Sequence, residues 1–202
     1  MKISFVSIED GITALGFRKM ASFARSIHPS TEVCYLPLTN AYNPLRFLFK
    51  PGEHDRVYSD ADLDSIASHF AKSDLVCFSS MTAYSDLTKE IIQLTKKINP
   101  KTYIIWGGIH PIVHPEDAIE YPDAICVGEG ETAFKLFLSS FKEGGDYTTT
   151  KNFWFNHNGE IIRNDFLPLH TSEEMDQFPF LLYADNELIF KHGKGFIPQN
   201  TN

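Results

Sequence analysis

Two short apolar runs, each followed by closely spaced glycines, constrain this chain more than any other feature. The first run, YIIW, ends at Gly107 and Gly108, and the second, AICV, ends before Gly128 and Gly130. Apolar runs without polar alternation are typical of parallel strands that are buried on both faces. Glycines after such strands let a ligand approach the backbone, because they lack a Cβ atom. We therefore expect two strand ends that form one pocket wall, although ordinary tight turns are the alternative interpretation.

Strand-like and helix-like runs alternate through the first 145 residues. Strands are predicted at 2–8, 32–36, 75–78, 103–106 and 124–127, and helices at 17–27, 61–70, 86–98 and 132–141. This alternation predicts an α/β fold: a flavodoxin-like (Rossmann-like), doubly wound sheet of five parallel strands in the order 2-1-3-4-5.

Two segments depart from this alternation. Residues 39–60 contain two prolines and an apolar cluster, which predicts an insertion that is either a surface loop or a lid or docking surface. Residues 146–202 begin with strand-like runs on either side of Asn158 and Gly159, a hairpin signal, and continue as an irregular, proline-containing stretch. We therefore predict an α/β domain at 1–145 and a hairpin with a linker at 146–202.

Composition and charge exclude several classes of function. The 202 residues include 18 Lys+Arg and 26 Asp+Glu, so the formal net charge of −8 has the wrong sign for a nucleic-acid backbone binder. No apolar run is long enough for a membrane span, and the first residues read as a strand rather than a signal peptide, so we expect a cytoplasmic protein. The GxGxxG and GxxxxGK(S/T) motifs are absent, which argues against dinucleotides and triphosphates.

The sequence predicts no metal site. Cys34, Cys77 and Cys126 are far apart in runs that read as buried strands, so we expect them to serve as small hydrophobic residues. His110 and His114 have the spacing of a helical ligand pair, but two prolines argue against a regular helix there.

Three motifs follow predicted strands in order: Ser79-Ser80-Met81-Thr82, Gly107-Gly108-Ile109-His110-Pro111 and Gly128-Glu129-Gly130-Glu131. Taken in this order, they resemble the motifs of the N-terminal cobalamin-binding half of cobalamin-dependent radical SAM enzymes. The runs GEIIR at 159–163 and MDQFP at 175–179 resemble the segment that joins this half to the catalytic barrel. Enzymes of this kind include methyltransferases and cyclases similar to the anaerobic Mg-protoporphyrin monomethyl ester enzyme.

The resemblance implies that the corrin of cobalamin lies over the strand ends and that its nucleotide tail enters a slot beside the sheet. Ser79, Ser80, Met81 and Thr82 would line the slot, Gly107 and Gly108 would admit the tail, and Gly128, Glu129 and Gly130 would hold its sugar-phosphate end; Thr13, Gly16 and His110 complete the predicted site. A valine at position 108 is then expected to block the slot with only a modest effect on folding.

Other cobalamin proteins carry a D-x-H-x-x-G loop whose histidine binds cobalt. Here the loop ends at Gly16, the histidine position falls on Thr13, and no histidine lies between residues 1 and 27. The resemblance therefore implies base-off cobalamin without a histidine ligand from this loop.

The CxxxCxxC run that holds the [4Fe-4S] cluster of radical SAM enzymes is absent from the sequence. We therefore interpret the chain as a fragment that binds cobalamin but does not catalyse alone, whose parent would add a radical SAM domain with the cluster and SAM. Two alternatives stay open: a vestigial domain that acts as a scaffold without cofactor, and a flavodoxin-like domain that holds another ligand such as flavin.

Overall fold

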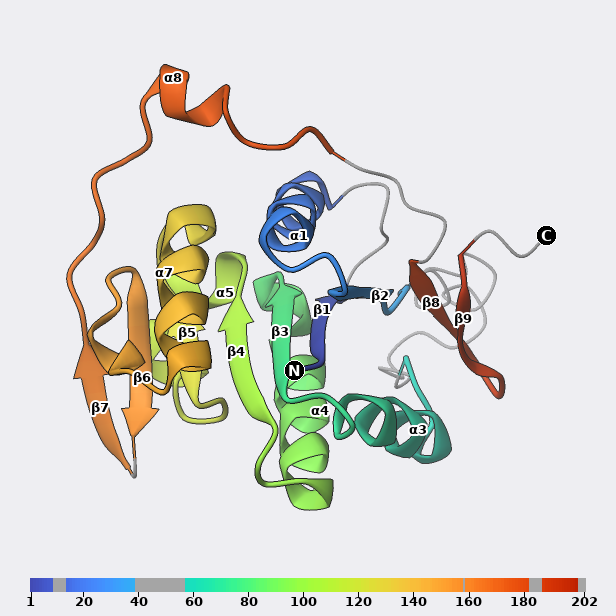
Figure 1. The fold of residues 1–202 in the computed structure, drawn as a ribbon. Coiled ribbons are helices and arrows are strands. Elements are labelled where there is room, and N and C mark those ends of the chain that lie inside the picture. Colours follow the sequence, from blue (N-terminus) through green and yellow to red (C-terminus); the bar gives the residue numbers. More distant parts are fainter. Residues whose placement is uncertain (9–13, 39–56, 158, 182–186, 200–202) are drawn as a thin grey trace.

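A single mixed β-sheet forms the centre of the computed structural model, which describes residues 1–8, 14–38, 57–157, 159–181 and 187–199. Within these residues the sheet has nine strands in the order β7-β6-β5-β4-β3-β1-β2-β8-β9, seen from left to right in Figure 1. The strands are β1 (Ile3–Ile8), β2 (Glu32–Tyr35), β3 (Leu75–Ser80), β4 (Tyr103–Gly107), β5 (Ala124–Cys126), β6 (Phe153–His157), β7 (Glu160–Arg163), β8 (Leu188–Lys191) and β9 (Gly195–Pro198).

The predicted parallel core is confirmed. Strands β2, β1, β3, β4 and β5 are neighbours in the order 2-1-3-4-5, and every pair among them is parallel. All six residues of β1 are buried, which explains why its sequence shows no polar alternation. Parallel pairing brings the carboxyl ends of these strands to one edge, where the glycine motifs lie.

Helices cover both faces of this parallel core (Figure 1). Helices α1 (Leu15–Ile27) and α7 (Gly130–Glu143) pack on one face, where Phe17 and Phe134 join a core with Phe5 of β1. Helices α3 (Asp60–Phe70) and α4 (Ser85–Ile98) pack on the other face, around Trp106 of β4. The shorter elements are α5 (Ile109–Val113), α6 (Pro115–Ala118), α8 (Ser172–Met175) and the 3-10 turns η2 (Thr82–Tyr84) and η3 (Tyr147–Thr149). No helix among the described residues is long and apolar enough to cross a membrane.

The sheet is wider than predicted, because two further strands extend it at each edge. The antiparallel strands β6 and β7 lie beside β5, and β8, which is parallel to β2, lies beside that strand with antiparallel β9 next to it. The predicted hairpin is present as β6 and β7, and β6 pairs with β5. The expectation of an irregular linker after residue 165 is wrong for 188–198, where β8 pairs with β2 and β9 pairs with β8. Each of these two strands has only four residues and no strong local pattern. Their stability therefore depends on pairing with β2, which lies far away in the sequence. The division at residue 145 stays a prediction.

Two local details of the helices follow from a capping residue and from prolines. Ser59 caps α3 in a capping box with Asp62, so the helix begins at Asp60, one residue before its predicted start. The segment with Pro111 and Pro115 forms two separate short helices, α5 and α6, that meet at His114. His110 and His114 therefore do not share one regular helix, as predicted. Most of the expected insertion, residues 39–56, lies outside the described residues.

A buried ion pair fastens the added edge of the sheet to α1. Glu187, directly before β8, accepts a 3.3 Å hydrogen bond from Arg18 Nη1, and the two side chains are 4% and 1% exposed. Arg25 Nη1 lies 3.7 Å from the other carboxylate oxygen of Glu187. Because neither charge can reach water, each depends on the other for compensation.

We predict that Glu187→Ala lowers the free energy of unfolding by about 3–5 kcal/mol, because it leaves buried guanidinium groups without their counter-charge. The matched control is Glu116→Ala, which removes an exposed partner of Arg163 at 2.7 Å and should cost about 0–1 kcal/mol. Urea denaturation of both variants measures the difference. Equal losses would show that the buried pair does not hold β8 in place.

Candidate functional site

A cavity of about 430 Å³ opens at the carboxyl ends of the parallel strands, between the sheet and helices α1 and α7. The strands contribute Phe5, Cys77, Ser79, Ile105, Gly107, Cys126 and Phe153, and the two helices contribute Leu15, Gly16, Phe17, Met20, Gly130, Glu131 and Phe134. Most of these side chains are apolar or very small. The cavity therefore suits a flat, largely apolar group better than a highly charged one.

Eight of the residues predicted from the sequence line this cavity: Gly16, Ser79, Ser80, Met81, Gly107, Gly108, Gly128 and Gly130. Thr82, His110 and Glu129 are not part of its lining. Thr13 lies outside the described residues.

Gly107 leaves open space in the cavity wall. It lies two residues after Ile105 on β4, so a side chain at position 107 would point to the same face, toward α1 and α7. A Cβ atom there would lie 3.8 Å from the Cβ atom of Cys126 and 3.8 Å from the carbonyl oxygen of Phe78. These are ordinary contact distances, so the site would tolerate a methyl group but lose space to a larger side chain.

Gly108 is required by the backbone rather than by the cavity. Its φ of +91° is in the region that favours glycine, and a Cβ atom would lie 2.7 Å from the carbonyl oxygen and 2.8 Å from the nitrogen of Ser80. A side chain at position 108 would therefore strain the contact between the ends of β3 and β4. This corrects the expectation that a valine there would block the slot with only a modest effect on folding.

Asn152, which the sequence analysis missed, holds the glycine loop after β5. It has a positive φ of 65° and is 3% exposed. Its side chain donates to the carbonyl oxygen of Glu129 at 2.8 Å and accepts from the backbone nitrogen of Leu167 at 2.7 Å. A Cβ atom on Gly128 would lie 2.8 Å from the Asn152 side chain. Gly128 is thus needed for this contact, and the tolerance of asparagine for positive φ is the only sequence signal for it.

The hydroxyl of Ser80 is already engaged within the protein. It accepts a hydrogen bond from Trp106 Nε1 at 2.9 Å and lies 3.0 Å from Thr88 Oγ1. Ser80 therefore fixes the ends of β3 and β4 relative to α4. Ser79, which is partly exposed on the cavity wall, is the better placed hydroxyl for a ligand.

His110 packs between structural groups. Its ring stacks on Trp106 with centroids 4.9 Å apart, and its Nε2 lies 2.9 Å from Asp117 Oδ2. Lys89 Nζ lies 2.7 Å from the same oxygen and is the first cause of the lowered pKa of Asp117. His110 therefore joins α5 to α6 and to β4.

Glu129 faces the segment that follows β7. Its carboxylate lies 2.6 Å from His170 Nδ1 and accepts from the backbone nitrogen of His170 at 3.2 Å. The His170 ring also reaches Thr132 Oγ1 at 2.8 Å. In Figure 1 the described part of this segment, which carries α8, runs above the upper ends of α7 and α1. Glu129 thus anchors that segment at the start of α7.

Glu131 gives the cavity a charged group, and two buried cysteines give it neutral thiols. Glu131 is a charged residue of the lining, and it pairs with Lys19 Nζ at 3.1 Å, which joins α7 to α1. Burial raises the pKa of the Cys126 thiol to about 11, so this wall presents a neutral SH group at neutral pH. Burial also raises the pKa of Cys77.

One family model matches the segment of the chain that holds most of this site. Residues 52–138 match the family model described as B12 binding domain. Among curated proteins, the chain is 25% identical over 134 residues to "Uncharacterized methyltransferase PH0819" of Pyrococcus horikoshii, which is 64% of this chain and 29% of that protein. The family match confirms the B12-binding resemblance seen in the motifs.

Solved structures share the fold. The methyltransferase TsrM from Kitasatospora setae, with tryptophan and a SAM analogue bound, matches 82% of this chain and 30% of its own length, with a TM-score of 0.59 and 15% identity. The cobalamin-dependent radical enzyme OxsB with aqua-cobalamin bound matches 83% of this chain and 22% of its own length, with a TM-score of 0.55 and 18% identity. The chain thus spans less than a third of the length of each of these proteins.

Alanine is predicted to destabilise the protein at Gly108 but not at the adjacent Gly107. Gly108→Ala should lower the free energy of unfolding by about 1–3 kcal/mol, because it forces a side chain into a glycine conformation against the backbone of Ser80. Gly107→Ala should change it by less than about 1 kcal/mol. Chemical denaturation of both variants is the measurement, and a Gly108→Ala protein as stable as the parent would contradict this reading of the loop.

Proposed function

We propose that this chain, whose residues 52–138 match the B12 binding domain family, binds cobalamin with its nucleotide tail in the cavity between the sheet and helices α1 and α7. The observation that carries the proposal is the position of that cavity. It lies at the carboxyl ends of the strands, and the matched segment contributes much of its wall, including Gly107 with its open space.

The chain's own residues would bind and orient the cofactor. Ile105 and Cys126 on the strands and Met20 and Phe134 on the helices offer the apolar surfaces for a flat base. Glu131 would accept a hydrogen bond from a hydroxyl of the tail. Cobalt chemistry, either methyl carriage or a part in radical reactions, is what the cofactor supplies when bound.

We further infer that the chain is the cofactor-binding part of a longer radical SAM methyltransferase or cyclase. Its length supports this, since it spans 29% of its methyltransferase relative and 30% of TsrM, which has been solved with cobalamin and a [4Fe-4S] cluster bound. The partner of this part would then be a radical SAM domain that holds the cluster and SAM.

Cobalamin binding can be tested with a size series at one position. Hydroxocobalamin mixed with the protein should stay bound after desalting at about one per chain. Gly107→Leu should weaken cobalamin binding at least tenfold, because its side chain fills the cavity. Gly107→Ala should bind cobalamin nearly as the parent does. Thermal unfolding of each variant controls for stability. Equal binding by Gly107→Leu would refute the tail position, and retention of flavin instead of cobalamin would favour a different cofactor; retention of neither would favour the scaffold alternative.

The proposed binding mode is base-off without a histidine ligand. No histidine is among the described residues that line the cavity, and none occurs between residues 1 and 27. The paramagnetic resonance spectrum of the Co(II) complex should therefore lack nitrogen superhyperfine splitting. A threefold splitting from histidine or from dimethylbenzimidazole would contradict this mode.

The 202 residues should not assemble an iron-sulfur cluster on their own. Cys34, Cys77 and Cys126 are buried on β2, β3 and β5, and burial raises the pKa of all three thiols. Three thiolates cannot gather around one cluster from these positions without opening the core. Anaerobic reconstitution with iron and sulfide should leave no stoichiometric cluster absorption, and a full [4Fe-4S] spectrum would overturn this expectation.

A further inference from the structure

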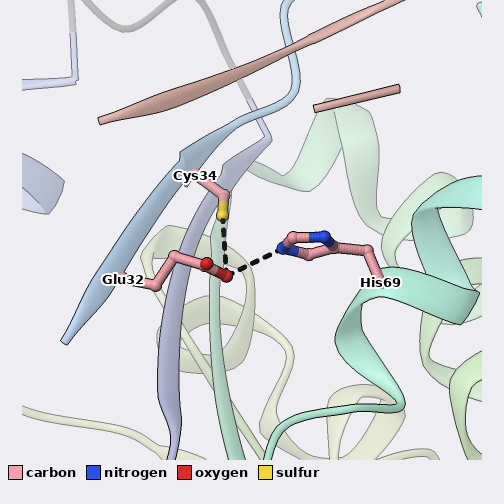
Figure 2. A group of neighbouring side chains, drawn as sticks. All are labelled: Glu32, Cys34 and His69. Carbon is pink, nitrogen blue, oxygen red and sulfur yellow. Dashed lines mark hydrogen bonds and ion pairs between the residues drawn. The ribbon is translucent and has the colours of Figure 1, made fainter. Parts of the chain in front are cut away.

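A cluster of three different metal-ligating side chains lies on β2 and α3, away from the cavity. Glu32 and Cys34 are two residues apart on β2, so they project to the same face of the sheet. His69 belongs to the last turn of α3, which packs on that face, and Figure 2 shows its ring turned toward the other two side chains. Glu32 begins β2, which places the cluster at the opposite end of the parallel strands from the glycine loops.

The three ligand atoms already lie close together. Glu32 Oε1 is 2.8 Å from His69 Nε2 and 3.7 Å from Cys34 Sγ, and all three atoms lie within 4.8 Å of one another (Figure 2). In a tetrahedral zinc site, ligand bonds of about 2.0–2.3 Å set the ligand atoms about 3.3–3.8 Å apart. Shifts of about 1 Å or less in each side chain would therefore bring the three atoms to zinc-binding distances.

The kinds of ligand select the class of metal. One thiol sulfur, one imidazole nitrogen and one carboxylate oxygen form the mixed set that borderline cations such as Zn²⁺ prefer, whereas Mg²⁺ and Ca²⁺ take oxygen ligands. On binding, the cation would displace the proton of the neutral Cys34 thiol into solvent, and the resulting thiolate and the carboxylate would together balance its divalent charge. We propose that Glu32, Cys34 and His69 form a binding site for a zinc-type divalent cation.

The surroundings hold the ligands and leave one side accessible. The His69 ring packs on Phe196 of β9 with centroids 4.3 Å apart and on Phe70 at 5.4 Å, so its orientation is restricted. The Cys34 side chain is buried, whereas the Glu32 and His69 side chains are each 22% exposed, so a cation would enter past these two and a water would be its fourth ligand.

Two neighbours now contact the carboxylate that the cation would use. Ser4 Oγ donates to Glu32 Oε1 at 3.1 Å, and Lys2 Nζ lies 3.5 Å from the same oxygen. The Lys2 side chain is 38% exposed, so it can move into solvent when a cation takes its place. The bound cation would tie β2 to α3 and, through Phe196, to β9, and it would raise the melting temperature of the protein. This site does not depend on the cobalamin proposal.

Cobalt(II) is a suitable probe for this site, because a thiolate bound to it gives a strong near-ultraviolet absorption band. The full chain, free of cobalamin and kept reduced without added thiols, is titrated with Co²⁺. We expect this band to saturate at one cobalt per chain and to disappear when Zn²⁺ is added. Zn²⁺ should also raise the melting temperature.

Matched variants identify the ligands. Cys34→Ser should abolish the thiolate band, and His69→Gln should weaken cobalt binding at least tenfold. Cys77→Ser removes a buried thiol outside the cluster, and His114→Gln removes a histidine outside it, so both should retain the parent spectrum. Circular dichroism checks that each variant is folded. The proposal would be overturned if the parent protein showed no cobalt-thiolate band at one cobalt per chain. It would also be overturned if this band persisted in Cys34→Ser. Neither outcome depends on the folding of the other variants.

Discussion

The close approach of the Gly108 backbone to Ser80 is the contact on which the candidate site depends. It sets the ends of β3 and β4 against each other, because only a glycine with positive φ fits beside the Ser80 carbonyl. Trp106 and Thr88 then fix Ser80 from the opposite face. Because these strand ends are held in place, the absence of a side chain at Gly107 leaves space in the cavity and does not loosen the sheet. The pocket is thus a consequence of how two strand ends pack.

The parallel core could be predicted because its sequence signals are local. Buried strands such as β1 show no polar alternation, and each helix between them carries one apolar face. The terminal strands could not be predicted in this way, since Leu188–Lys191 and Gly195–Pro198 are short and pair with residues far away in the sequence. The ion pair of Arg18 with Glu187 spans 169 positions and gives no local pattern.

The site shows the same division between local and distant information. Motif order located the glycine loops, and most of the predicted residues do line the cavity. It could not assign each residue its role, because His110 and Glu129 turn to partners outside the motifs, namely Asp117 and His170. Asn152 was missed because its importance comes from positive φ and from bonds across 15 and 23 positions. The cluster of Glu32, Cys34 and His69 was also missed, because Glu32 and His69 are 37 positions apart in the sequence.

The central claim is that the cavity between α1, α7 and the sheet receives the nucleotide tail of cobalamin. A crystal structure of the protein with cobalamin tests this most directly. Our account predicts density for the tail beside Gly107, between Met20 and Cys126, with its base detached from the cobalt. An empty cavity, with the base still bound to cobalt or with the cofactor at another surface, would contradict it.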